Sequence, residues 1–464
     1  MMVQWNEGFE SSQMVWLLLA TIILGVTFLP AAVVLLTRGR CLKEFADHSS
    51  QWFLFAAFHA STWLLFQYSL AFGPSLGQHF GEAVAGPPAG LETMIRQAES
   101  TDDKTHVIGR GGVIGNLEFA GFRGLAPEGN EEQPLFSSRR PHHHVSHVAF
   151  LNFHLVLYLS VAMVIGAQAR RLMSPSATLI FTCLWGTLIY APTSHWVWGD
   201  GWLGMRGALD AGGGLLPLTL GVSSLALTVF RTGPLTAAET DLEPVERGET
   251  QIPAASLILY WLGSIVLIST ISMPSPHLRA IAMLNGILAP CAGLLTYAAL
   301  LLIASRRSHQ FTTTTGILTG LSAVAPGCTV FDPQTAVIVA VFGALAAFGV
   351  WSLVARLRPT IDLEIPCALV SSSVTGLLAV GIFGNSATGV FHWDKSPIRS
   401  LILGESDQLV DQMLTAVAVA GFVFLVTAAL LWVIPKSRQQ SHTSLQSSPI
   451  EPTRIDQPES MVIG

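Results

Sequence analysis

Long apolar runs without charge constrain this chain more than any other feature. Residues 14–36 are MVWLLLATIILGVTFLPAAVVLL, and residues 414–434 are LTAVAVAGFVFLVTAALLWVI. Each run matches the roughly 20 residues that a helix needs to cross a bilayer. Charged residues make up only 12% of the chain, which is about half the share found in soluble globular proteins. The sequence therefore predicts an all-α polytopic membrane protein.

Eleven segments are candidate transmembrane helices. Several contain Gly, Ser, Thr or Pro, which are tolerated in spans that pack against other helices rather than against lipid. The candidate spans are residues 14–36, 51–73, 147–168, 176–193, 207–230, 254–273, 279–304, 313–331, 336–356, 366–385 and 411–434. The first has no basic segment before it and is too long for a signal peptide, so we expect a retained helix.

Basic residues predict the orientation, because they follow every odd-numbered span. Arg38 and Arg40 follow the first span, Arg170 and Arg171 follow the third, and Lys436 follows the eleventh. Cytoplasmic loops carry an excess of Lys and Arg. We therefore expect the N-terminus outside, the C-terminus in the cytoplasm, and a multi-pass protein of the inner or plasma membrane.

Residues 1–435 are predicted to form one membrane domain. Within it, residues 74–146 form a long extracytoplasmic loop rich in Gly and Pro. Residues 436–464 are rich in Ser, Gln and Pro, a composition typical of a disordered cytoplasmic tail. The cluster His142–His144 lies in the long loop, where a solvated stretch is favoured over a metal site.

Motifs for covalent chemistry are missing from the sequence. The five cysteines are scattered, and none has the spacing of metal ligands. No segment resembles a phosphate-cradling loop or a nucleophile beside a base, and no acidic or basic pair lies inside a span. We therefore predict a protein that is not an enzyme, holds no cofactor and binds no nucleic acid.

Several motifs, taken in order along the spans, resemble those of the ammonium transporter family. HWVWGDGWL (195–203) and GALDAGGG (207–214) are similar to the family's "HWVWGGGWL" and to the start of its "GALDFAGGTVVHINAG". WLLFQYSLAFG (63–73), AMLNGILAP (282–290) and GILTGLSAVAPGC (316–328) also follow family patterns on the matching spans. By this resemblance the chain is identified as a member of that family.

The resemblance implies a homotrimer in which each subunit has a narrow hydrophobic pore. In the family, an aromatic ring and a hydroxyl recruit ammonium at an outer vestibule. The ion then passes two phenylalanines, loses its proton, and meets two hydrogen-bonded histidines. A cation is attracted to an indole face, whereas its passage through a hydrocarbon-lined bore is costly. Imidazoles can relay the separated proton.

Three residues match the family's outer site. Trp198 falls on the vestibule tryptophan, although a tryptophan of the membrane interface is the alternative. Asp210 falls on the buried aspartate at the start of the fifth helix, where it can also have a purely structural role at the positive helix end. Thr270 falls on the position of the vestibule hydroxyl.

The phenylalanine pair is only partly matched. Phe150 matches the outer ring through its HVAF context. The partner expected four residues later is His154, unless Phe153 has taken its place. His154 is the candidate for a substitute proton relay, with a packing or hydrogen-bonding role as its alternative. The other polar candidates are His59, for which a structural role is favoured, and Ser371–Ser373, which also let helices approach closely.

Both pore histidines are replaced by residues that cannot relay a proton. The first falls on Leu218, or on Pro217 if one residue has been deleted after Asp210, and the second falls on Leu369. We therefore expect a pore whose proton relay is altered or lost.

The predicted function is transport of ammonium or ammonia across a bilayer. Two alternatives stay open: a non-conducting ammonium sensor or regulatory subunit, and a pore for another small neutral molecule such as carbon dioxide. The expected partners are ammonium or ammonia, the lipid bilayer and further copies of the chain, with a cytoplasmic regulatory protein as another candidate.

Overall fold

Each of the eleven predicted spans is helical in the computed structural model. The structure describes residues 11–39, 47–76, 111–123, 128–130, 133–135, 146–230, 254–272, 275–304, 311–357, 363–385 and 397–434. The first five spans are α1 and α2 (Ser11–Val26 and Phe28–Leu36), α4 to α5 (Ser49–Thr62 and Tyr68–Phe72), α7 (His147–Ala169), α8 to α9 (Pro175–Trp185 and Ala191–Trp198) and α11 (Leu215–Val229). The other six are α13 (Ala254–Ile268), α14 (Pro276–Ile303), α15 (Phe311–Val324), α16 (Pro333–Leu357), α17 (Glu364–Phe383) and α18 (Asp407–Val433).

Among the described residues, six helical segments are long and apolar enough to cross a membrane by length and composition. They are α1 with α2, α7, α14, α16, α17 and α18. The second and fourth spans are interrupted by π-helical turns, η1 (Trp63–Gln67) and η3 (Gly186–Tyr190), while α15 continues into the 3₁₀ turn η4 (Ala325–Gly327). α11 and α13 are shorter apolar helices.

Helix starts are set by local sequence signals. The hydroxyls of Ser146 and Ser174 accept hydrogen bonds from the backbone N–H groups three residues later, and so cap α7 and α8. Pro175 is the first residue of α8, where its missing N–H is not needed. These are the signals by which a helix is expected to begin.

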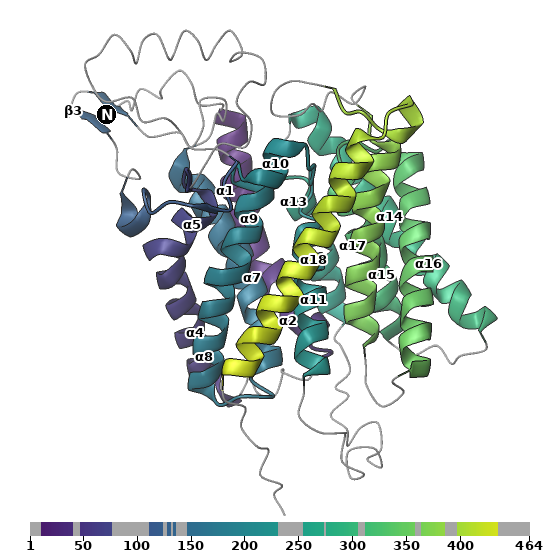
Figure 1. Ribbon diagram of the computed structural model, residues 1–464, viewed down its shortest axis with the longest axis horizontal. Coiled ribbons are helices and arrows are strands. Elements are labelled where there is room, and N and C mark those ends of the chain that lie inside the picture. Colours follow the sequence, from purple (N-terminus) through teal and green to yellow (C-terminus); the bar gives the residue numbers. More distant parts are fainter. Residues whose placement is uncertain are drawn as a thin grey trace, which may run out of the picture.

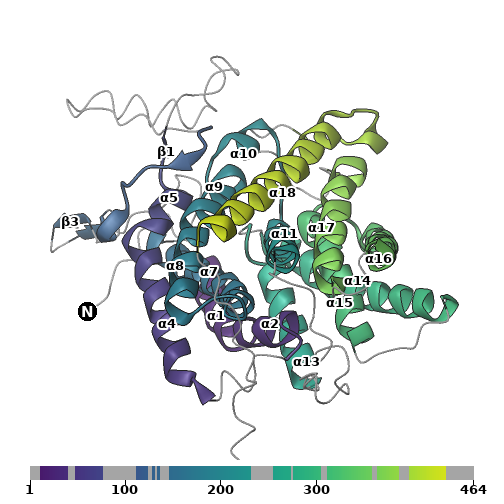
Figure 2. The same ribbon diagram turned by 60° about the horizontal axis from the view of Figure 1, so that its bottom comes forward.

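The helices form one bundle, with the first half of the chain beside the second (Figure 1). α18 crosses the bundle obliquely and packs against α17, α11 and α8, as Figure 2 shows from another side. A short helix, α10 (Trp202–Arg206), joins α9 to the segment that leads into α11.

Large apolar side chains remain exposed on the outer helices. Leu295, Ile303, Val417 and Trp432 have exposed fractions of 72%, 80%, 72% and 87%. A protein in water buries most such groups, whereas a bilayer accepts them. Together with the spans, they define an all-α polytopic membrane protein.

Part of the long loop between α5 and α7 folds into short strands that were not expected. β1 (Ser75–Leu76) pairs with β2 (Ile114–Gly115), and β3 (Glu128–Asn130) pairs with β4 (Gln133–Leu135), both antiparallel. A short 3₁₀ turn, η2 (Ala120–Phe122), follows β2. The cluster His142–His144 and the predicted tail lie outside the described residues.

Candidate functional site

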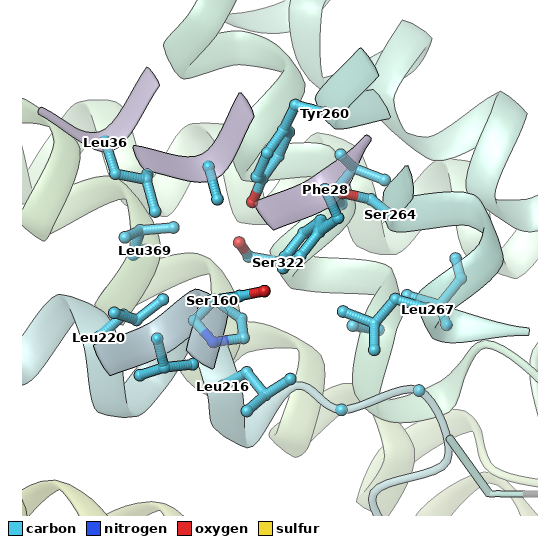
Figure 3. A pocket seen from close by; sticks show the side chains of 18 residues that line it. Phe28, Leu36, Ser160, Leu216, Leu220, Tyr260, Ser264, Leu267, Ser322 and Leu369 are labelled. Atoms are coloured by element: carbon cyan, nitrogen blue, oxygen red, sulfur yellow. The ribbon is translucent and has the colours of Figure 1, made fainter. Parts of the chain in front are cut away.

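A narrow cavity of about 40 Å³ lies among α2, α7, α11, α13, α15 and α17 (Figure 3). Most of its lining is apolar. The lining residues are Phe28, Ala32, Leu36, Ser160, Val161, Gly212, Gly213, Leu216, Pro217, Leu220, Tyr260, Ser264, Leu267, Ile268, Leu321, Ser322, Ala325 and Leu369. Among these described residues, none is a histidine, a carboxylate or a basic side chain, and the polar groups are hydroxyls.

Three leucines lie at one end of the cavity. Leu36 ends α2, Leu220 lies on the second turn of α11, and Leu369 is five residues into α17. Figure 3 shows these three leucines together, with Leu267 toward the opposite end. The basic residues that follow α2 place the leucine end on the predicted cytoplasmic side.

Two of the positions that the sequence comparison predicted for the lost pore histidines lie at this cavity. Pro217 and Leu369 both line it, whereas the described lining does not include Leu218. Pro217 is the third residue of α11. A proline is tolerated there because the first N–H groups of a helix have no partner within the helix.

Asp210 caps the helix that carries Pro217. Its two carboxylate oxygens accept hydrogen bonds from the backbone N–H groups of Gly214 and Leu215, at 2.6 and 3.0 Å. Gly213, directly before Gly214, has φ +81°, a conformation that glycine adopts without strain. Gly212 packs against the carbonyl oxygen of Ala325, where a larger residue would clash. Asp210 therefore positions the outer wall of the cavity through the backbone.

One face of α7 extends from the cavity toward the predicted outside. Successive residues of a helix are turned by about 100° around its axis. Viewed along α7, Phe150, Phe153 and Leu157 therefore fall within the sector between Ser160 and Val161, which is the sector that faces the cavity. His154 falls about 20° outside that sector and about 10 Å outward of Val161 along the helix. Both candidates for the second gate ring therefore lie above the cavity.

His154 lies in an aromatic cluster outside the cavity lining. Its ring centroid is 4.3 Å from those of Phe72 and Phe150, and 6.4 Å from that of Trp198. The His154 side chain is buried, while Trp198 is partly exposed. We call Phe72, Phe150, His154 and Trp198 the outer aromatic cluster. It brings together three of the residues predicted from the sequence.

Thr270 is bound within the protein. Its hydroxyl donates to the carbonyl oxygen of Val266 and accepts from the indole N–H of Trp16, at 2.7 and 2.8 Å. The guanidinium group of Arg279 lies 4.9 Å above the centre of the same indole. The hydroxyl proton and one lone pair of Thr270 are thus occupied, and a positive charge lies nearby.

Two other buried histidines have structural contacts. His59 makes hydrogen bonds of 2.9 Å with the hydroxyls of Tyr158 and Thr182. His195 makes hydrogen bonds with the Ser75 hydroxyl and the Ala71 carbonyl oxygen, at 2.9 and 3.1 Å. Both rings join helices or loops of the bundle.

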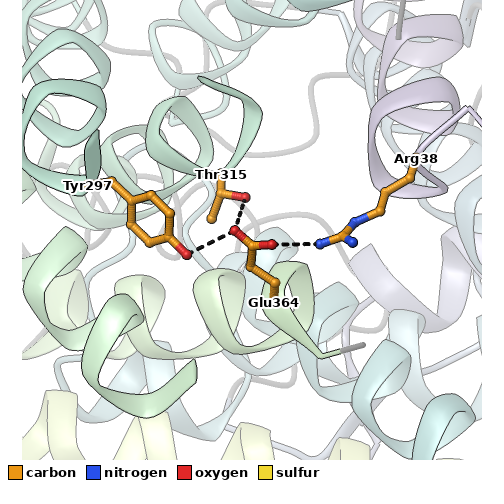
Figure 4. A network of polar contacts seen from close by, with 4 residues as sticks. All are labelled: Arg38, Tyr297, Thr315 and Glu364. Carbon is orange, nitrogen blue, oxygen red and sulfur yellow. Dashed lines mark hydrogen bonds and ion pairs between the residues drawn. The ribbon is translucent and has the colours of Figure 1, made fainter. Parts of the chain in front are cut away.

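A polar network near the leucine end was missed from the sequence. The carboxylate of Glu364 pairs with Arg38 at 2.9 Å and accepts hydrogen bonds from the hydroxyls of Tyr297 and Thr315, at 2.9 and 3.0 Å (Figure 4). It joins the ends of four elements, α2, α14, α15 and α17. The presence of Arg38 after the first span was the only sequence signal.

The fold and the cavity together define a pore-like polytopic membrane protein. A family model described as the ammonium transporter family matches residues 15–439. The chain belongs to the ammonium transporter family.

Curated relatives and solved structures agree with this assignment. An ammonium transporter of Bacillus subtilis is 27% identical over 333 residues, covering 69% of this chain and 76% of the relative. The crystal structure of Candida albicans Mep2 has a TM-score of 0.70 at 18% identity, covering 92% of this chain and 85% of that one. Saccharomyces cerevisiae Mep2 has a TM-score of 0.69 at 19% identity, covering 92% and 86%. At these identities the structures show the shared fold.

Proposed function

We propose that this protein passes neutral ammonia through its pore without a stoichiometric proton. The observation that carries the proposal is the cavity lining, which includes Pro217 and Leu369 and in which no described residue is an acid or a base. We take these two positions as those of the family's histidines. Moving a cation through such a lining would cost several kcal/mol or more. A neutral base avoids most of that cost.

The outer aromatic cluster is proposed as the place where ammonium is recruited and loses its proton. Trp198 offers a ring face to a cation, and the imidazole of His154 lies beside it. In this proposal the proton released by ammonium returns to the outer solution, and only ammonia continues inward. Phe150, a member of this cluster, is proposed as the outer gate ring, and Leu157 lies between the cluster and the cavity along α7. Thr270 is not assigned to recruitment, because its hydroxyl already holds Trp16.

The vestibule assignment is tested by Trp198→Ala. We expect a higher half-saturating ammonium concentration with little change in maximal flux, because recruitment precedes the pore. Thr270→Ala serves as the comparison and should leave the half-saturating concentration unchanged. Equal half-saturating concentrations in wild type and Trp198→Ala would restrict Trp198 to the membrane interface.

Neutral passage is tested in proteoliposomes given an ammonium pulse. An internal pH dye reports ammonia entry as alkalinisation, and a solid-supported membrane reports charge movement on the same preparation. We expect alkalinisation faster than in protein-free vesicles, without a protein-dependent current. A current that persists in His154→Ala would contradict the proposal, since it would require a proton path elsewhere.

Binding without conduction is the second candidate, and the leucine end of the cavity favours it. The side chains of Leu36, Leu220 and Leu369 converge there. An end formed by three leucines offers no hydrogen bond to a molecule leaving the cavity. In the same assay, alkalinisation equal to that of protein-free vesicles together with retained ammonium binding would select this function.

We also propose that the chain assembles as a homotrimer with one pore in each subunit. The support is membership of the family, for which the trimer is the expected assembly. Light scattering of the detergent-purified protein, corrected for bound detergent, should give three times the mass of one chain. A monomeric mass in several mild detergents would contradict the proposal.

A further inference from the structure

Four hydroxyl groups provide the polarity of the described cavity lining. Ser160 comes from α7, Tyr260 and Ser264 from α13, and Ser322 from α15. All four residues are buried, with exposed fractions of 1% to 6%. Figure 3 shows the hydroxyls of Ser160, Tyr260 and Ser322 pointing into the cavity. Hydroxyls held in an apolar cavity favour an occupant that can form hydrogen bonds.

These hydroxyls differ in what they can offer. Ser160 donates its proton to the carbonyl oxygen of Val156 at 2.7 Å, so its lone pairs remain as acceptors. The Tyr260 hydroxyl lies in hydrogen-bonding contact with that of Ser264. Its phenolic O–H is more acidic than an aliphatic hydroxyl and is therefore the better donor of the two. The hydroxyl of Ser322 can rotate to serve as donor or acceptor. The cavity thus offers both a donor and an acceptor.

Ammonia matches this arrangement. Its nitrogen lone pair is a strong acceptor, and its N–H groups are weak donors. Carbon dioxide, by contrast, has no hydrogen atom to donate and is a weak acceptor. Discrimination by hydrogen bonds is effective because a mismatched molecule leaves buried polar groups unpaired.

We infer that Tyr260, Ser160 and Ser322 form a hydrogen-bonding site for a small neutral nitrogen base, in place of the histidine pair. We call these three residues the hydroxyl site. The inference rests on the proposed neutral passage and adds the residues that give the pore its selectivity. Tyr260 donates to the nitrogen lone pair, Ser160 accepts an N–H, and Ser322 completes the contact. Because no proton is transferred between the site and the base, the site orients the base without relaying charge.

Tyr260→Phe and Ser322→Ala test the hydroxyl site, because each removes a hydroxyl with little change in shape. Tyr190→Phe and Ser373→Ala are matched controls, since both positions are buried and outside the described lining. Ammonia permeability is measured from alkalinisation of proteoliposomes, and carbon dioxide permeability from their acidification. We expect each test variant to lower ammonia permeability by about 3- to 10-fold, the value of one hydrogen bond. Carbon dioxide permeability should be unchanged, and the controls should resemble wild type.

Wild-type ammonia permeability in both test variants would overturn the hydroxyl site while leaving neutral passage intact. An equal fall for ammonia and carbon dioxide would also overturn it, because it would indicate a change of shape. If vesicles with the wild-type protein are no more permeable to ammonia than empty vesicles, the proposal of neutral passage is wrong. The hydroxyl site is then tested by a binding measurement. Radiolabelled methylamine in alkaline buffer should then bind wild type and the controls more tightly than Tyr260→Phe. Equal binding, or no binding to wild type, would reject the hydroxyl site.

Discussion

The ion pair between Arg38 and Glu364 should contribute strongly to stability, and Arg38→Met tests this. Both side chains are largely buried, with exposed fractions of 12% and 14%. Removing one member of a buried pair leaves the other charge uncompensated, at a cost of about 3–5 kcal/mol. The remaining hydroxyl donors, Tyr297 and Thr315, offset part of this cost. We therefore expect a loss of about 2–4 kcal/mol in the free energy of unfolding.

The backbone at Arg38 supports the same expectation. Arg38 has φ +54°, in the left-handed region, and its N–H bonds to the carbonyl oxygen of Leu35 at the end of α2. The N–H of Gly39 bonds to the carbonyl oxygen of Val34, which completes a Schellman motif. Glycine is the usual residue at this position, and another residue there costs about 1–2 kcal/mol. The ion pair explains why an arginine is held there.

A double-mutant cycle in detergent micelles measures the coupling between the two charges. Arg38→Met, Glu364→Gln and the double variant are unfolded by denaturant, and their free energies are compared. The double variant should lose less than the sum of the single variants, with a coupling of about 2–3 kcal/mol. Arg206→Met is the control, because Arg206 pairs with Asp411 at 2.8 Å but is 55% exposed and should contribute about 1 kcal/mol or less. A coupling below about 0.5 kcal/mol would refute the reasoning, because additivity means that the charges act independently.

Three further predictions concern the cap, the relay and the orientation. Asp210→Asn should lower the free energy of unfolding by about 1–3 kcal/mol, because one of two backbone N–H groups loses its acceptor; an unchanged denaturation midpoint would contradict the capping role. Pro217→His combined with Leu369→His should introduce an ammonium-dependent current in proteoliposomes, absent from either single variant; its absence in a folded double variant would mean that two imidazoles are not enough. In a background without native cysteines, a membrane-impermeant maleimide added to intact cells should label Leu117→Cys and leave Ala304→Cys unlabelled; the reverse pattern would invert the predicted topology.

The architecture could be predicted because each span carries its own signal. The length of the hydrophobic runs and the basic residues after odd-numbered spans are local features of the sequence. The predictions based on them therefore did not depend on tertiary contacts. The π-helical turns η1 and η3 and the strand pairs in the long loop were not predicted. These features depend on packing: Gly186, for example, begins η3 directly against the ring of Tyr158.

The candidate site was harder to predict than the fold. The choice between Pro217 and Leu218 is a shift of one residue, which turns the side chain by about 100° around the helix. Sequence counting left both positions open, and the structure shows Pro217 in the cavity lining. The hydroxyls of Ser160, Tyr260 and Ser322 come from three helices, and no spacing within one helix brings them together. The rotation of each helix in the bundle determines that they share a cavity.

The proposed replacement of both pore histidines, at Pro217 and Leu369, would let a pore lose its relay while its fold stays intact. Losing one member of a buried hydrogen-bonded pair leaves the other unsatisfied, at a cost of about 1–3 kcal/mol. Replacing both members by apolar groups leaves no such orphan and can be nearly neutral. The proline lies in the first turn of α11, where Asp210 already satisfies the N–H groups of Gly214 and Leu215. On this proposal the two replacements compensate each other in stability, so that their effect would fall on what the cavity conducts.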